Sequence, residues 1–433
     1  MTSNNIIGTL SNGIKYIYNN TQNSSSVGVL LLVRYGAGFD QKSGMAHLLE
    51  HLLFKGTKKR PKTKEIMAEF NSIGSEFNAY TSKNFTGYHA KSSYNHLEQN
   101  IDILSDLLVN TDFYREGFDN EFIQEKKIVL EELKAIKDNN MRYLSECLEK
   151  NIFKNELGYS EKDDIDAIDG ISLKDIIDTY KKYYVGSNII VSINGNLGES
   201  VDKIPELLQK YLGKLPKGET NKKLFDKTFL NKSFKSKQII TKTNIQKSFL
   251  SMSYIDNGYL SRQKYYINEL FRLIFSDLTS GRLFQEIREK LGLVYSIHSS
   301  HFSYDFIGFL SIQTSTNTNN IKSGELLAEY DKQVEEITKN GMTQKELEIA
   351  KSNFSSKLLL SLEDSMTLTE YNAYELFYHE NDFVEYSKII DLINSFTLLE
   401  INNYIKDLFK NPRITTIITS ESIDDSNSNC ILC

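Results

Sequence analysis

The spacing of hydrophobic residues along the chain changes sharply at Gly44. Before this residue, "GIKYIYNN" and "SVGVLLLVRYGAG" are short, rich in β-branched and apolar residues, and bounded by Asn, Ser and Gly, which predicts strands. After it, apolar residues recur at steps of three and four, which predicts a helix with one buried face. The apolar positions of that helix are Met45, Leu48, Leu49, Leu52 and Leu53.

The predicted strands and helices occur in the same order in the first and the second half of the chain. "TKEIMAEFNSIG" predicts a second helix capped by Thr63, and the alternating "SEFNAYTSKNFTGYHAKSS" predicts a hairpin. Long helices are expected at about 95–110 and 119–151, and "SLKDIIDTYKKYY" and "SNIIVSINGNL" predict a closing helix and strand. A second round predicts the strand "QKSFLSMSYI", the helices "RQKYYINELFRLIFSD" and "RLFQEIREKLG", the hairpin "LVYSIHSSHFSYDFIGFLSIQTST", long helices from about 320 to 409, and the strand "RITTIITS".

This recurrence predicts an α+β protein made of two homologous repeats, each a mostly antiparallel sheet covered by helices. The repeat length of roughly 210 residues is within the usual domain size. We expect one repeat over residues 1–217, a Lys-rich linker over 218–236, and a second repeat over 237–422. The polar composition of "SESIDDSNSN" predicts a disordered tail at 423–433.

Composition and charge exclude several classes of partner. The net charge of −6, with lysines spread among acids, gives no basic field for nucleic acid. The longest apolar run near the start, "VGVLLLV", is too short to span a bilayer, and no signal or transit pattern precedes it. We therefore expect no nucleic acid or membrane partner and a cytoplasmic location.

Three cysteines, Cys147, Cys430 and Cys433, are too few for a disulfide framework in a chain of 433 residues. The terminal "CILC" has the outline of a prenylation box or of a CxxC pair. Neither interpretation has support, because Cys is not a usual last residue of the box, no polybasic stretch precedes it, and no second CxxC is present.

The predicted helix after Gly44 contains "HLLEH", which brings two histidines and a glutamate into an apolar run. His47 and His51 are one turn apart on one face, and Glu50 projects beside them. Two imidazoles so placed can bind one metal ion, and a glutamate at this position can act as a base. The HxxEH order reverses that of the HExxH zinc signature.

A catalytic zinc takes three protein ligands, so one ligand remains to be found. In "EFIQEKKIVLEELKAI", Glu125 and Glu132 are two helical turns apart and share a face beside an apolar flank. Glu131, one position earlier than Glu132, is the alternative ligand and points about 100° away.

Four segments in this order resemble the pitrilysin-type zinc peptidases, the inverzincins, and especially the short bacterial relatives of the mitochondrial processing peptidase. They are "AHLLEHLLFKGT", "NAYTSKNFTGYHAK", "EKKIVLEEL" and "RLFQEIREKLGLVYS". The resemblance implies that each chain binds one Zn²⁺ through His47, His51 and Glu132, with Glu50 as general base. Glu125 matches a second acidic position of the same helix. We place it with the catalytic residues, because it is expected to support the metal site without binding the ion.

The same resemblance implies how substrate binds. Asn78 and Ala79 match positions that hold the substrate backbone as an added strand, and Arg288 and Tyr295 match a pair that reaches the substrate carbonyl. The interval of 81 positions from His51 to Glu132 is a few longer than expected, with "FYREGFDN" as the place of the insertion.

We therefore predict a zinc metalloendopeptidase that cuts short or unfolded polypeptides, such as leader peptides or presequences. The alternative is a non-catalytic partner subunit of a heterodimeric peptidase of this family. Such subunits usually lack part of the HxxEH set, whereas this chain has both that set and the Arg/Tyr pair. Because two repeats make half of the clamshell chamber of longer members, we expect a homodimer, with a heterodimer of related chains as the alternative.

Overall fold

The computed structural model describes residues 5–136 and 138–421, which form two compact units. Unit 1 contains residues up to Lys134, together with Glu161–Lys223 and Leu359–Ile389. Unit 2 contains Ala135–Ser160, Leu224–Leu358 and the chain from Ile390 onward. The tail at 423–433, with Cys430 and Cys433, lies outside the described residues.

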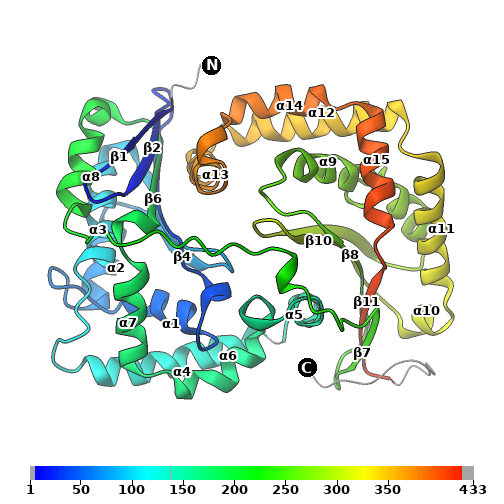
Figure 1. Ribbon diagram of the computed structural model, residues 1–433, viewed down its shortest axis with the longest axis horizontal. Helices are drawn as coiled ribbons and strands as arrows, with labels where there is room; N and C mark the ends of the chain where they lie inside the picture. Colours follow the sequence, from blue (N-terminus) through cyan, green and yellow to red (C-terminus); the bar gives the residue numbers. More distant parts are fainter. Residues whose placement is uncertain (1–4, 137, 422–433) are drawn as a thin grey trace. The chain divides into compact units, whose positions relative to one another are not determined.

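Unit 1 is built on a six-stranded sheet in which β2 and β6 are parallel and all other neighbours are antiparallel (Figure 1). β3 and β6 lie in the middle and consist almost entirely of buried residues. In sheet order the strands are β1 (Ile6–Thr9), β2 (Lys15–Asn20), β6 (Ile189–Gly195), β3 (Ser26–Val33), β5 (Thr86–Ser93) and β4 (Glu76–Thr81).

Helices cover both faces of this sheet. Adjacent residues at the end of β4 point to opposite faces, and there Thr81 contacts Glu50 of α1 whereas Tyr80 contacts Tyr374 of α13. α1 and α13 therefore lie on opposite faces. The helices of unit 1 are α1 (Met45–Leu53), α2 (Thr63–Ser72), α3 (Leu97–Val109), α4 (Phe118–Ile136), α6 (Glu161–Ala167), α7 (Leu173–Tyr183), α8 (Ile204–Leu212) and α13 (Ser365–Tyr378).

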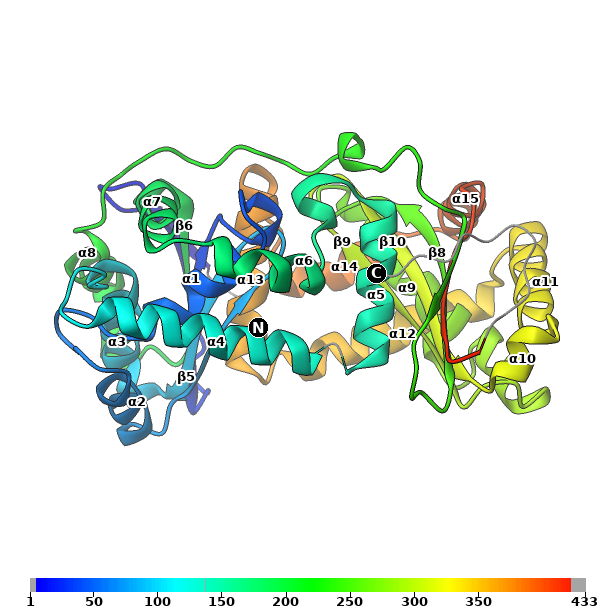
Figure 2. The same ribbon diagram turned by 90° about the horizontal axis from the view of Figure 1, so that it is seen from below.

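Unit 2 repeats this plan with five strands (Figure 2). Its sheet order is β7 (Lys237–Thr241), β11 (Ile414–Thr419), β8 (Ser248–Asp256), β10 (Gly308–Thr316) and β9 (Ser296–Ser303), with β7 and β11 parallel. The helices are α5 (Asn140–Ile152), α9 (Arg262–Arg272), α10 (Thr318–Lys322), α11 (Glu325–Asn340), α14 (Ile389–Ser395) and α15 (Leu398–Phe409), and α12 (Gln344–Ser361) leads the chain back into unit 1. Two π-helical segments, Leu273–Asp277 and Phe284–Lys290, follow α9.

Each unit contains one helix from the opposite half of the sequence. α13 packs on β3 and β6 of unit 1, where Ala373 and Leu376 join Leu30 and Leu32 in one core cluster. α5 packs on β8 and β11 of unit 2, where Leu144 and Cys147 join Ile240 and Ile418. The compact units thus differ from the linear division into 1–217 and 237–422, because these helices bury their apolar faces on the sheet of the other repeat.

The α+β class and the two mostly antiparallel sheets confirm the prediction from the sequence. The single helix predicted over 119–151 is wrong, since α4 ends at Ile136 and α5 starts at Asn140. The Asn139 side chain accepts a hydrogen bond from the Arg142 backbone and caps the new helix. Thr63 is the first residue of α2 and not its cap. The short strands β1 and β7 were not predicted.

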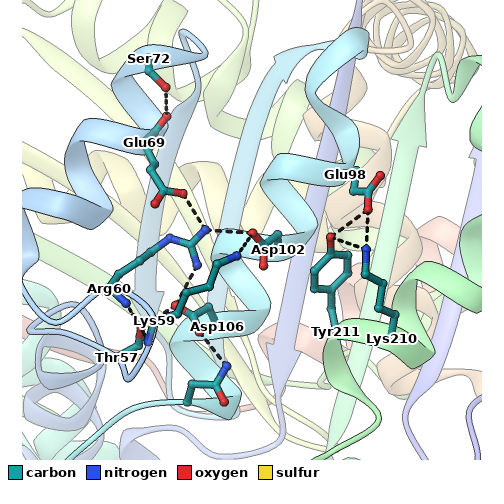
Figure 3. Close-up of polar contacts among 11 residues, drawn as sticks. Thr57, Lys59, Arg60, Glu69, Ser72, Glu98, Asp102, Asp106, Lys210 and Tyr211 are labelled. Carbon is teal, nitrogen blue, oxygen red and sulfur yellow. Dashed lines mark hydrogen bonds and ion pairs between the residues drawn. The ribbon is translucent and has the colours of Figure 1, made fainter.

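A buried arginine connects the helices that follow the HxxEH segment (Figure 3). Arg60, which is 2% exposed, donates to Asp106 at 2.8 Å, to Asp102 at 2.9 Å and to Glu69 at 2.6 Å. Thr57 donates to the same Asp106 carboxylate. A buried guanidinium is tolerated only when paired, so this cluster fixes α2, α3 and the loop after α1 as one body.

No helix among residues 5–136 and 138–421 combines the length and the apolar composition that crossing a membrane requires.

Gly28 lets α13 approach the sheet closely, which gives a first prediction. A Cβ added at Gly28 would lie 2.7 Å from Thr369 Oγ1 and 3.3 Å from Met366 Cα, both on α13. We expect Gly28→Ala to lower the free energy of unfolding by about 1–3 kcal/mol through overpacking. Gly170→Ala is the matched control, because a Cβ there meets no atom within 4 Å. Equal denaturant midpoints for the two variants would show that α13 does not pack here as described.

Candidate metal centre

α1 holds its histidines in place because the rest of the helix is buried. Seven of its nine residues are buried, and His47 and His51 are the partly exposed ones. Asp40 fixes the start of the helix by accepting the Ala46 backbone N–H at 3.1 Å and the Tyr35 hydroxyl at 2.6 Å. Burial raises the pKa of Asp40 to about 8, although these two hydrogen bonds oppose the rise.

The three predicted ligands lie together. His47 Nε2 is 3.2 Å from His51 Nε2, and Glu132 places one carboxylate oxygen 3.8 Å from the first nitrogen and the other 3.4 Å from the second. A tetrahedral zinc with bonds of about 2.0–2.1 Å spaces its ligand atoms about 3.3–3.4 Å apart. Two imidazole nitrogens and a carboxylate at these distances fit a zinc ion. Among the described residues they form the one cluster of three or more His, Cys, Asp or Glu suited to a metal.

Glu131 does not join this cluster. Its side chain is 73% exposed and pairs with Lys134 at 2.8 Å. Glu132, the next residue, faces the histidines with a side chain that is 45% exposed. Of the two candidates from the sequence, the geometry thus brings only Glu132 to the histidine pair.

Glu125 lies behind His51 and orients its ring. Its Oε1 is 3.0 Å from His51 Nδ1, which leaves Nε2 directed at the cluster. Its Oε2 pairs with Lys55, a residue that the sequence analysis did not single out. Burial would raise the pKa of Glu125, but the hydrogen bonds from His51 and Lys55 outweigh it and keep the pKa below its usual value.

Negative charge exceeds positive charge around the histidines. Burial acts to lower the pKa of His51, but its hydrogen bond to Glu125 and the charges of Glu50 and Glu132 raise the pKa overall. A site with this balance attracts a cation. The sequence pattern does not reveal this excess of negative charge, because it arises only where α1 and α4 lie side by side.

Glu50 is buried beside the cluster. It is 8% exposed, and its Oε2 accepts a hydrogen bond of 2.6 Å from the Thr81 hydroxyl. Burial raises the pKa of Glu50, while the hydrogen bond from Thr81 and the charge of His51 limit the rise. A carboxylate whose pKa lies above the usual value is better matched to accepting a proton near neutral pH.

The strand that carries Asn78 and Ala79 is an edge of the sheet. β4 pairs with β5 alone among the described strands, and α1 packs beside it. The Ala79 N–H donates to the Asn78 Oδ1 at 2.9 Å, so this N–H points away from β5. An added strand can pair with such an edge, and the resemblance implies that substrate binds in this way.

Arg288 and Tyr295 belong to unit 2, where they lie close together. The Arg288 guanidinium is 5.6 Å from the Tyr295 ring centroid and 4.3 Å from that of Phe284. Tyr295 is 76% exposed. The exposed Tyr295 and the half-buried Arg288 therefore form one group at the second π-helical segment.

Models of one peptidase family match most of the chain. The model described as "Insulinase (Peptidase family M16)" matches residues 15–162, which contain the whole cluster, and "Peptidase M16 inactive domain" matches residues 170–354. The chain belongs to peptidase family M16.

Relatives within family M16 extend the comparison. "Uncharacterized zinc protease YmxG" of Bacillus subtilis is 28% identical over 410 residues, which cover 93% of this chain and 95% of that protein. The beta subunit of the mitochondrial-processing peptidase of Caenorhabditis elegans is 29% identical over 226 residues, covering 52% of this chain and 48% of the subunit. The fold matches the crystal structure of a protease from Helicobacter pylori with a TM-score of 0.82 and 22% identity, over 96% of this chain and 99% of that one.

The positions of Glu131 and Glu132 generate a prediction about zinc affinity. Glu132→Gln should weaken zinc binding by about 100-fold or more, because it replaces an anionic ligand with a neutral amide. Glu131→Gln should leave the affinity nearly unchanged, since that side chain is turned to solvent. Competition of each purified variant with a metal chelator measures both affinities. Equal losses would show that the wrong face of α4 has been assigned to the metal.

Proposed function

We propose that the chain is a zinc-dependent metalloendopeptidase that hydrolyses short or unfolded polypeptides. The observation that carries the proposal is the ligand-spaced group of His47, His51 and Glu132 beside the buried carboxylate of Glu50. Membership of a peptidase family and relatives named as zinc proteases support it.

His47, His51 and Glu132 would hold one Zn²⁺ per chain. The bound ion supplies a Lewis acid that polarises the substrate carbonyl and acidifies water. Glu50 accepts a proton from the attacking water and then delivers it to the leaving amine nitrogen. Because water attacks directly, no residue of this chain needs to form a covalent intermediate.

The remaining predicted residues position the substrate in this proposal. The open edge of β4 at Asn78 and Ala79 takes an extended peptide as an added strand, with main-chain hydrogen bonds that do not depend on sequence. Arg288 and Tyr295 reach the substrate and help to polarise its carbonyl. Leader peptides and presequences are extended chains that suit such an edge.

A non-catalytic partner subunit is the second candidate function. The match of residues 170–354 to an "inactive domain" and the name of a relative as one subunit of a peptidase favour it. The complete set of ligands and base in this chain favours the enzyme. Zinc content per chain together with turnover of an unfolded peptide separates the two candidates.

We also propose a cytoplasmic homodimer in which each copy contributes one zinc site. The chain has two sheets of similar plan, and the resemblance to longer family members implies a chamber made of four such repeats. A heterodimer with a related chain is the alternative, and a relative that is named as a subunit supports association in general.

Replacement of the base tests the mechanism. Glu50→Gln should retain zinc, because Glu50 is not a ligand, and should lower the cleavage rate by about 10²–10⁴-fold. The assay measures cleavage of an unfolded generic protein, with bound zinc determined in the same sample. Survival of activity in a zinc-loaded Glu50→Gln protein would show that another group is the base.

Assembly gives a separate prediction. In sedimentation at working concentration, the active species should have twice the mass of a single chain. It should cleave an unfolded protein much faster than the same protein folded, because a closed chamber admits only flexible chains. A fully active monomer would contradict the dimer, and equal rates on the two substrates would contradict size selection.

A further inference from the structure

Thr81 makes the hydrogen bond that holds the Glu50 side chain. Its Oγ1 donates to Glu50 Oε2 at 2.6 Å, which is the short distance expected when a hydroxyl donates to an ionised carboxylate. Within residues 5–136 and 138–421, no other hydrogen bond reaches this carboxylate. The second oxygen of Glu50 is therefore free to accept a proton.

Thr81 is also part of the edge to which a substrate strand would add. The Ser82 N–H donates to the Phe85 carbonyl at 2.8 Å, which makes these two residues a hydrogen-bonded pair of the hairpin. Such pairs alternate along antiparallel strands, so the next residue, Thr81, and Ala79 are in non-hydrogen-bonded positions. Their main-chain groups consequently face the open side of β4. The hydrogen bond from the Ala79 N–H to the Asn78 side chain agrees with this direction.

Thr81 thus directs its main chain to the open edge of β4 and its side chain to the Glu50 carboxylate. We propose that Thr81 is a positioning residue that fixes the proton-accepting rotamer of Glu50 and couples it to the strand on which substrate docks. This inference rests on the proposed peptidase function. A peptide that pairs with β4 immobilises the Thr81 backbone, and the hydroxyl then holds Glu50 at a fixed distance from the bound carbonyl.

Three substitutions test the role of Thr81. Thr81→Val keeps the shape and removes the hydroxyl, so kcat should fall about tenfold or more while KM for an unfolded peptide changes little. Thr81→Ser restores the hydroxyl and should return kcat to within a few-fold of the wild type. Zinc content should be the same in all variants, because Thr81 is not a ligand.

Thr86→Val is the matched control, since Thr86 is the cross-strand neighbour of Thr81 and also donates a hydrogen bond, to the Tyr35 carbonyl at 2.8 Å. It should lower the melting temperature without the selective loss of kcat. Equal loss of kcat in Thr81→Val and Thr86→Val, or wild-type kcat in Thr81→Val, would overturn the proposal.

A double-mutant cycle examines the hydrogen bond without using activity. Thr81→Val should lower the denaturation midpoint of the wild-type protein and should have little effect in a Glu50→Ala background, where the acceptor is missing. Equal shifts in the two backgrounds would overturn the inference. If the wild type itself cleaves no peptide, the proposed function fails, and the cycle still decides whether Thr81 holds Glu50.

Discussion

The candidate metal centre depends on one buried carboxylate, that of Glu125. Its side chain is 5% exposed, and an unpaired carboxylate at that depth would cost several kcal/mol. Both oxygens are therefore occupied, one by His51 Nδ1 and the other by the Lys55 ammonium. The two partners come from α1 and the residues just after it. Thus a single acid on α4 fixes the neighbouring helix at two points and sets the ring orientation of His51.

The position of Glu132 follows from this attachment. It is seven residues beyond Glu125, about 10.5 Å along the same side of α4. Once Glu125 is fixed under His51, the helix delivers Glu132 to the outer side of the histidine pair, where its side chain is 45% exposed. The distances among the candidate ligand atoms are therefore set by the packing of two helices around a charge pair. A site assembled in this way is preorganised for an ion, with its open side toward solvent.

Local periodicity explains what could be predicted from the sequence. His47, Glu50 and His51 lie within one helix, and their spacing alone places them on one side of it. Glu125 and Glu132 were recognised in the same way, as neighbours on one face of α4. Lys55 and Thr81 were missed because their partners are on other elements, and contacts between distant segments have no periodic signal.

The fold was predictable to the same extent, in its local elements but not in the contacts between distant segments. Most strands and helices were predicted from alternating or three-to-four spacing, and the recurrence of elements gave two sheets. The exchange of α5 and α13 was not predicted, because an amphipathic helix carries no information about which of two similar sheets it will cover. Gly28 carries a partial signal of this packing. A glycine in a central strand can mark a place where another element approaches the sheet closely, and here that element is α13.

In both units, a hydrogen bond joins the helix that follows a central strand to the edge strand of the sheet. The helix residue in this bond is an acid in unit 1 and a base in unit 2. In unit 1 the carboxylate of Glu50 on α1 accepts from Thr81 on β4. In unit 2 the guanidinium of Arg272 on α9 donates to Ser299 on β9 at 3.1 Å, and it pairs with Glu269 and Asp277 at 3.0 Å each. Glu269 and Asp277 are thus paired with a cation that belongs to the chain. In unit 1, Lys55 pairs with Glu125, whereas Glu132 approaches the nitrogens of His47 and His51. Glu50 accepts its hydrogen bond from a neutral hydroxyl. Among the described residues, this is the one group of His, Cys, Asp or Glu with the spacing of metal ligands, and its excess of carboxylates suits a cation from solution.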